Sequence, residues 1–148
     1  MSELEVRYAS WGRRAAGFII DSMIVYVLSL IVGAVIVGLG AGVGGNSGAW
    51  AGLFLGFLAA LSFTGWYWVY LEGRPAGQTL GKHMVGIRVR AVSGGPAGYG
   101  RAFGRNAFMV VLFVVFAPAW ILDLLWPLWD SQKQCLHDKI ASTVVQRV

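Results

Sequence analysis

The sequence predicts an all-α integral membrane protein with about three hydrophobic segments, organised as a single membrane domain over residues 1–148. Of these 148 residues, 57% are hydrophobic and 13% are charged, whereas soluble domains carry about 25% charged residues. Residues 22–71 contain no charged side chain, and about 20 apolar residues suffice to span a bilayer. The composition therefore excludes a soluble enzyme core, a disordered chain and a repeat array.

The first span is expected at residues 15–37, which would measure roughly 34 Å as a helix. It contains one charged residue, Asp21. It is also longer than the apolar region of a signal peptide, so we interpret it as a retained span. The uncharged, glycine-rich residues 38–48 favour a flexible turn after it.

The second span is expected at residues 49–70. Gly52, Gly56 and Ala60 recur every four residues in it, which places small side chains on one helix face and predicts a close-packing seam. Four tryptophan and tyrosine residues cluster at its end, and such side chains favour the level of the lipid headgroups.

A basic loop follows at residues 71–106. Its one acidic residue is Glu72, and its six basic residues are Arg74, Lys82, Arg88, Arg90, Arg101 and Arg105. Basic residues beside membrane spans mark the cytoplasmic side, so the net charge of +5 needs no nucleic-acid partner. We expect the N-terminus and this loop to be cytoplasmic, with the side chains of Lys82, Arg88, Arg90 and Arg105 near lipid headgroups.

Within this loop, residues 87–90 alternate between apolar and basic side chains, and a turn-forming run follows at residues 93–96. Alternation with a period of two is typical of a strand. The loop therefore contains a short β-like element.

The third hydrophobic segment covers residues 107–129 and is interrupted by Pro118, Asp123 and Pro127. Proline removes a backbone donor and breaks or kinks a helix. Two arrangements remain open: one kinked span, or a re-entrant pair of short helices that would return the tail to the cytoplasmic side.

Several sequence segments together resemble the RDD family of small, mostly bacterial membrane proteins, over nearly the whole chain. These segments are Arg14 with Asp21, then GQTLGK at residues 77–82, GIRV at 86–89, Arg105 with Asn106, and LHDKIASTVV at 136–145. The tail reads Ala-Ser-Thr where the family usually has Ala-Gly-Thr, and the run before His137 is less basic than is typical.

The resemblance implies a multi-pass protein of the bacterial plasma membrane. The family is named for one arginine and two aspartates, which correspond to Arg14, Asp21 and Asp138. Most members have no assigned activity, some are described as cation/proton antiporters, and a transport role is commonly proposed.

Asp21 supports two interpretations. A buried carboxylate in a span must face the protein interior and be paired or protonated. It can serve as a cation or proton ligand, or as one half of a fixed ion pair that ties the first span to the basic loop or tail. Arg14 lies two helical turns before it on the same face, roughly 10 Å along the axis.

Asp123 is the second acidic residue in a hydrophobic segment. It can join Asp21 in a two-carboxylate exchange site, or it can be an interfacial residue at the end of a broken helix, which the surrounding tryptophans favour. Asp138 is expected to be a salt-bridge or capping partner for arginines of the head or the basic loop.

Other kinds of site are not expected. Residues 77–82 lack the first glycine and the final Ser or Thr of a phosphate-binding loop. His83, Cys135 and His137 lack the spacing of a structural zinc site. The single cysteine excludes an internal disulfide, and no nucleophile signature is present. The sequence therefore predicts no cofactor, no metal and no enzymatic activity.

Two functions remain open. The chain can be a transporter-like protein that exchanges a cation for protons as an oligomer, because three short segments enclose little space on their own. Alternatively, it can be a non-transporting accessory or scaffold subunit that binds a larger membrane complex or anionic lipid. The transported substrate cannot be inferred from these residues.

Overall fold

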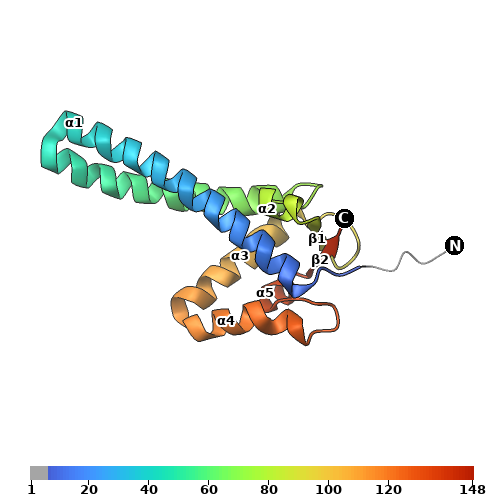
Figure 1. Cartoon of the computed structure of the whole chain (residues 1–148). Coiled ribbons are helices and arrows are strands. Elements are labelled where there is room, and N and C mark those ends of the chain that lie inside the picture. The colour runs from blue at the N-terminus through green and yellow to red at the C-terminus, as the bar shows by residue number, and fades with distance from the viewer. Residues whose placement is uncertain (1–6) are drawn as a thin grey trace. The chain divides into compact units, whose positions relative to one another are not determined.

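The computed structural model describes residues 7–148, which divide into two compact units. The first unit contains the residues up to Asp21 together with Trp68–Val148, and the second contains Ser22–Tyr67. The elements, in chain order, are α1 Trp11–Gly73, α2 Leu80–Met84, β1 Ile87–Ala91, α3 Gly98–Val115, α4 Ala117–Leu125, the 3-10 helix η1 Trp126–Leu128, α5 Leu136–Ile140 and β2 Thr143–Arg147 (Figure 1).

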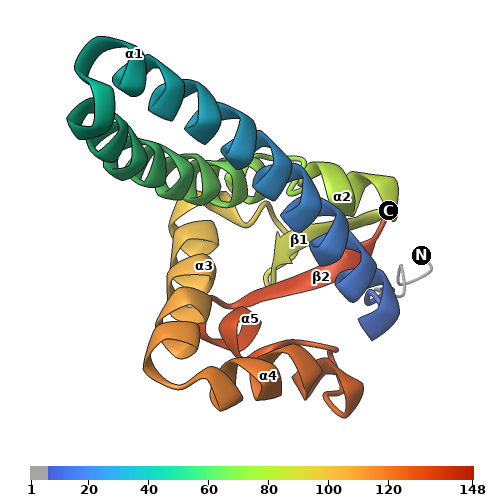
Figure 2. The same cartoon turned by 60° about the vertical axis from the view of Figure 1, so that its left-hand side comes forward.

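The second unit is a helical hairpin formed by the middle of α1. Gly45 is the non-helical residue inside α1, with φ 56° and ψ −136°. The two arms on either side of it run side by side in both views (Figures 1 and 2). Glycine adopts this positive φ without the steric penalty of a Cβ atom, so the chain reverses at one residue.

The expected turn at residues 38–48 is therefore much shorter in the structure. These residues stay helical except at Gly45, and the expected spans at 15–37 and 49–70 lie within longer helical arms. Glycine in a helix costs up to about 1 kcal/mol relative to alanine. Here that cost is offset by close packing, because a Cβ atom on Gly48 would collide with the carbonyl oxygen of Gly40.

The small-residue seam predicted for the second span faces the other arm of the hairpin. A Cβ atom on Gly52 would lie 2.9 Å from both the carbonyl oxygen of Ile36 and the Cα of Val37, and one on Gly56 would lie 3.4 Å from the Cα of Gly33. The seam thus packs the two arms of one chain together. An oligomer would have to use another surface.

The second unit also exposes large apolar side chains, including those of Tyr26, Leu39, Trp50 and Phe54. Among the described residues, α1 is the helix that is long and apolar enough to cross a membrane, with a mean hydropathy of 2.6 in its most apolar 18-residue window. Only 6% of that window is buried. An apolar surface of this extent marks contact with a membrane or another protein.

The first unit contains a two-stranded antiparallel sheet in which Val89 of β1 is opposite Val145 of β2. The buried core beneath it includes Ala9, Ile87, Val89, Ala97 and Val145. The strand predicted for residues 87–90 is confirmed, and its alternate residues are buried as the period of two requires. The backbone N–H of Ala9 donates to the carbonyl of Val145 at 2.8 Å, which ties the head to the tail.

The third hydrophobic segment forms two helices rather than one kinked helix. The chain turns at Phe116, with φ −155° and ψ 88°, and α4 begins at the next residue with Pro118 in its first turn, where the missing N–H leaves no bond unmade. The rings of Phe113 and Trp120 pack edge to face across the turn, with their centroids 5.5 Å apart. After α4 and α5 the chain reaches β2, so the tail lies beside the strand of the basic loop (Figure 2).

Candidate functional site

The first unit buries a set of ionisable side chains that come from both ends of α1 and from the later helices. We call this set the charged cluster. It consists of Arg14, Asp21, Glu72, Lys82, Arg105, Asp123, His137 and Asp138. All four of its carboxylates are essentially inaccessible to solvent. Buried charges are retained only where they are paired and hydrogen-bonded, so the partners of each decide what the cluster can do.

Asp138 joins the two ends of the chain. Its Oδ2 accepts a hydrogen bond from Nη1 of Arg14 at 2.6 Å, and its Oδ1 lies 3.3 Å from Nη2 of Arg105. The backbone N–H of Cys135 also donates to Oδ2, at 3.1 Å, which caps the start of α5. Asp138 thus binds an arginine of the head and an arginine of the loop, the arrangement that the sequence interpretation predicted.

These neighbours keep Asp138 ionised. Burial by itself raises the pKa of the carboxyl group, but its neighbours, with the charge of Arg105 first and that of Arg14 among the others, lower it by more, so the pKa lies well below its usual range. The pKa of Arg105 is raised, because the attraction of Glu72 and Asp138 exceeds the effect of burial. Both groups are therefore charged at any physiological pH.

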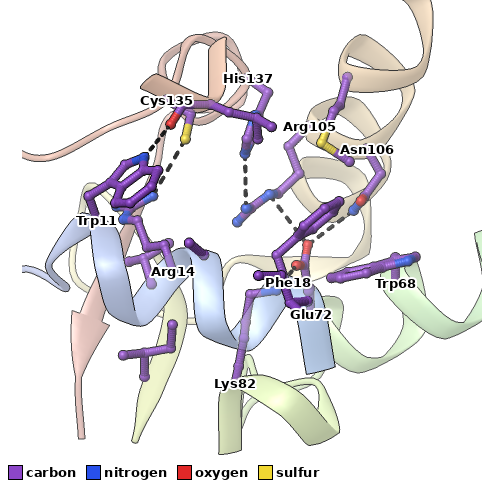
Figure 3. A pocket seen from close by; sticks show the side chains of 16 residues that line it. Trp11, Arg14, Phe18, Trp68, Glu72, Lys82, Arg105, Asn106, Cys135 and His137 are labelled. Carbon is purple, nitrogen blue, oxygen red and sulfur yellow. Dashed lines mark hydrogen bonds and ion pairs between the residues drawn. The ribbon is translucent and has the colours of Figure 1, made fainter. Parts of the chain in front are cut away.

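Glu72 is the second centre of the cluster (Figure 3). Its Oε1 lies 2.8 Å from Nζ of Lys82, and its Oε2 lies 3.3 Å from Nε of Arg105. The side-chain amide of Asn106 donates to Oε2 at 3.0 Å. Because Arg105 contacts both Glu72 and Asp138, its guanidinium group links the two carboxylates.

Asp21 is held mainly by the short helix α2. Thr79 donates its hydroxyl to Oδ2, the backbone N–H of Gly81 donates to Oδ1 at 2.7 Å, and Nζ of Lys82 lies 4.0 Å from Oδ2. A Cβ atom on Gly81 would lie 2.8 Å from Cγ of Asp21. Only glycine lets the backbone approach this closely, which explains the Thr-Leu-Gly-Lys order of the motif.

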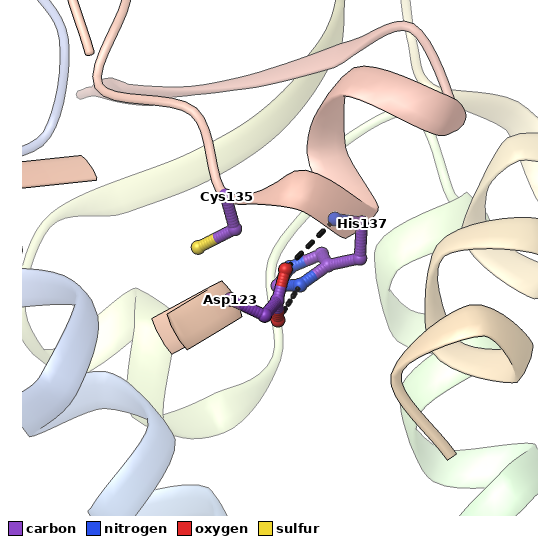
Figure 4. A group of neighbouring side chains, drawn as sticks. All are labelled: Asp123, Cys135 and His137. Atoms are coloured by element: carbon purple, nitrogen blue, oxygen red, sulfur yellow. Dashed lines mark hydrogen bonds and ion pairs between the residues drawn. The ribbon is translucent and has the colours of Figure 1, made fainter. Parts of the chain in front are cut away.

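Asp123 binds His137 through two hydrogen bonds (Figure 4). Its Oδ1 accepts the backbone N–H of His137 at 2.9 Å, and its Oδ2 lies 2.6 Å from Nδ1 of the ring. Nη2 of Arg105 lies 3.2 Å from the other ring nitrogen, Nε2. A guanidinium group can only donate, so Nε2 accepts this bond, and the proton on Nδ1 is donated to Asp123.

Cys135 lies beside this pair, and its sulfur and the ligand atoms of Asp123 and His137 are within 4.8 Å of one another. The donor set fits a metal ion poorly. Nδ1 of His137 is engaged by Asp123, and burial together with Asp138 raises the pKa of the Cys135 thiol far above its usual value. Metals bind the thiolate rather than the thiol. Arg14 also lies next to the sulfur, with Nη1 at 3.9 Å.

The structure brings the three residues that the resemblance assigns to the family's name into one cluster. Arg14 and Asp138 are in direct contact, and Asp21 connects to them through Lys82, Glu72 and Arg105. The carboxylate that Arg14 contacts at 2.6 Å therefore comes from the far end of the chain, although Asp21 is much nearer to it in sequence.

Two expectations for basic residues are wrong. Lys82 and Arg105 were expected at lipid headgroups, but they are only 7% and 6% exposed. They are buried because Glu72 and Asp138 provide partners for their charges. Arg88 and Arg90 are half-buried on the outer face of β1.

Asp123 lies near the C-terminal end of α4, which agrees with its expected place at the end of a broken helix. Its side chain is fully buried, because the backbone and ring of His137 satisfy both carboxylate oxygens.

Sequence reasoning did not assign Glu72, Thr79, Asn106 and His137 to the site. Glu72 could have been suspected from the sequence, because it is the one acidic residue in a loop that has six basic residues. Its partner Asn106 is 34 positions away, so no local pattern could pair them.

Comparison with known proteins gives a family and partial relatives. The model of the RDD family matches residues 8–142. The proline-rich antigen of Mycobacterium leprae is 33% identical over 89 residues, which are 60% of this chain and 34% of the relative. A proline-rich antigen homolog of Mycobacterium tuberculosis is 30% identical over 89 residues, 59% of this chain and 35% of the relative. The chain thus spans about a third of the length of these relatives. No solved structure matches it.

Proposed function

The chain belongs to the RDD family, and from that premise we propose that it is a multi-pass protein of the bacterial plasma membrane with a transporter-like role. The observation that carries the proposal is the continuous, buried charged cluster in an otherwise apolar chain. Buried ionisable groups with perturbing partners are candidates for binding ions and protons, and two of the cluster's carboxylates, Asp21 and Glu72, flank the apolar arms of the hairpin in the chain. The exchange of a cation for protons is the transport reaction that this cluster supports best.

The helical hairpin supports two membrane crossings. Residues 22–44 and 46–67 are helical on either side of Gly45, and each stretch would measure more than 30 Å at 1.5 Å per residue, enough to cross the hydrocarbon core. The helix α4 is too short to cross by itself, and the first half of α3 carries Arg101 and Arg105, which leaves only its second half apolar. In our proposal they form a re-entrant pair whose backbone is sheltered by the rest of the unit.

This arrangement places all of the basic residues on one side of the membrane. The twelve Lys and Arg residues lie in the head, the basic loop and the tail, and none lies in the turn around Gly45. Because β1 pairs with β2, the loop and the tail share one side. Placing that side in the cytoplasm satisfies the positive-inside rule with every basic residue.

Two groups of the cluster can carry the exchanged charge. Asp21 is a carboxylate held by a hydroxyl and a backbone N–H, with Lys82 at the longer distance of 4.0 Å. The pair of Asp123 and His137 shares a proton across the 2.6 Å contact between Oδ2 and Nδ1. We propose that a cation at Asp21 and a proton at this pair alternate.

The test is cation flux in proteoliposomes driven by a pH gradient, measured for Na⁺ and K⁺. We expect Asp21→Asn to abolish flux while its melting temperature stays close to that of the parent. Asp130→Asn is the matched control, because Asp130 lies outside the cluster and binds a half-exposed lysine. It should transport normally.

A second function is favoured by the saturation of the cluster. Every carboxylate in it accepts at least two hydrogen bonds or ion pairs. Such complete pairing is expected where charged residues only stabilise the fold. Under this alternative the chain is an accessory or scaffold subunit of a larger membrane complex. A folded parent protein without flux of either cation, together with loss of stability in Asp21→Asn, would favour the alternative and contradict transport.

A further inference from the structure

We propose that the first unit contains a binding site for a lipid-like molecule whose polar end is an anionic oxygen group, a carboxylate or a phosphate. The site is a cavity beside the charged cluster, and its existence does not depend on whether the protein transports ions. The argument uses the shape of the cavity, its unpaired hydrogen-bond donors and its charge.

The cavity has a volume of about 350 Å³, which is within the range of small-molecule sites. Its walls are mostly apolar and include the side chains of Trp11, Phe18, Trp68, Met109 and Leu124 (Figure 3). These side chains come from both ends of α1 and from α3 and α4. An apolar chain, rather than a small free ion, is complementary to such walls.

Two arginines that line the cavity have buried donors without a partner among the described residues. These atoms are Nε and Nη2 of Arg14 and Nη1 of Arg105. Both guanidinium groups are at least nine-tenths buried. Buried donors are almost always satisfied in proteins, and a guanidinium group can only donate. An oxygen acceptor in the cavity would supply the missing partner.

The charge of the lining favours an anionic acceptor. Arg14, Lys82 and Arg105 line the cavity, and Glu72 is the carboxylate among the lining residues. Asp138 neutralises part of the charge of Arg14 and Arg105 through their other nitrogens, but it is not part of the lining. A carboxylate or phosphate oxygen that reached the unpaired nitrogens of Arg14 and Arg105 could form charge-assisted hydrogen bonds with them.

The experiment uses the full chain purified in a neutral detergent and a palmitate analogue with a photoreactive diazirine in its acyl chain. We expect crosslinks on cavity residues such as Phe18 and Met109, mapped by mass spectrometry. Unlabelled palmitate or lysophosphatidate should compete, and which of them competes better separates a free fatty acid from a phosphate lipid. Hexadecyltrimethylammonium has the same chain without an acceptor and should not compete, and inorganic phosphate should not compete either.

Two lysine substitutions test the donors directly. Arg14→Lys and Arg105→Lys keep the positive charge but lose the unpaired donor atoms, so crosslinking should fall at least tenfold. Arg90→Lys makes the same chemical change on β1, away from the cavity lining, and should crosslink like the parent. Ala15→Leu places extra volume at the cavity wall without altering any charge, and it should also reduce crosslinking if a lysine variant fails to fold.

Three results would overturn the proposal. The first is crosslinking spread evenly over the exposed apolar residues of α1. The second is equal competition by the cationic amphiphile, which would show partitioning into an apolar surface without recognition of the head. The third is unchanged crosslinking in both Arg105→Lys and Ala15→Leu.

Discussion

At the scale of single residues, the buried charges of the first helix bind partners from distant segments of the chain. Arg14 and Asp21 are seven positions apart on one helix face, yet Arg14 binds Asp138, which is 124 positions away. Asp21 instead contacts Thr79 and Gly81 in α2. The partner of a buried charge is therefore decided by which segments pack together, which no spacing along a single helix reveals.

The first prediction concerns the charge of Asp138. Asp138→Asn should destabilise the protein by about 3–5 kcal/mol, because it leaves Arg14 and Arg105 buried with less compensation. Thermal unfolding in detergent measures this. Asp130→Asn is the control and should cost less than Asp138→Asn, since its partner Lys139 is half-exposed and water can solvate the lysine left behind. A loss in Asp138→Asn no larger than in the control would contradict the role of Asp138.

The pH dependence follows from the same group. The pKa of Asp138 is depressed in the folded state, so its contribution to stability is fully present above the unfolded pKa of about 3.9. The contribution is lost as the pH falls toward the lower folded pKa. Unfolding followed from pH 6 to pH 3 should show a smaller loss of stability in Asp138→Asn than in the parent. Parallel curves would count against the assignment.

A double-mutant cycle tests whether Arg14 is coupled energetically to Asp138 or to Asp21. Arg14→Gln combined with Asp138→Asn should be more stable than the sum of the single changes predicts, by about 0.5–3 kcal/mol, because neither charge is left alone. Arg14→Gln combined with Asp21→Asn should show the smaller coupling of the two. A larger coupling in the second combination would restore the local pairing.

At the scale of elements, hydropathy and periodicity predicted most of the secondary structure. The strand expected at residues 87–90 is present, because alternation of buried and exposed residues is a property of neighbouring positions. The paired helices of the third segment were one of two open alternatives, since a proline shows where a helix can break but not the direction in which the chain continues.

The glycines of the hairpin carry a prediction at this scale. Gly52→Ala should destabilise the protein, because the new Cβ would lie 2.9 Å from the backbone of the facing arm. Gly65→Ala is the matched control, with nothing within 4 Å of its Cβ, and it should be neutral or stabilising by up to about 1 kcal/mol. Melting temperatures of the two variants in the same detergent decide the point. Equal shifts would mean that the arms do not pack closely at Gly52.

At the scale of the whole molecule, we predict on which side of the membrane each segment lies. Single cysteines replacing Asn46, Arg90 and Val148 in a Cys135→Ser background would be treated with a membrane-impermeant thiol reagent on intact cells. We expect labelling at position 46 and none at 90 or 148, because our proposal places the turn outside and the loop and the tail together inside. Labelling at 148 without labelling at 90 would contradict a re-entrant third segment, and strong labelling at 90 would reverse the orientation.

By itself, the sequence determined the apolar character of the chain, the position of the helical hairpin, the strand of the basic loop and the resemblance to the RDD family. These features depend on composition and on the order of residues close together in the chain. Only the tertiary structure decided that Lys82 and Arg105 are buried, that Glu72 joins them, and that Asp123 holds His137. The physical reason is that a charge can be buried only when partners compensate it. Those partners come from segments that folding brings together from distant parts of the chain.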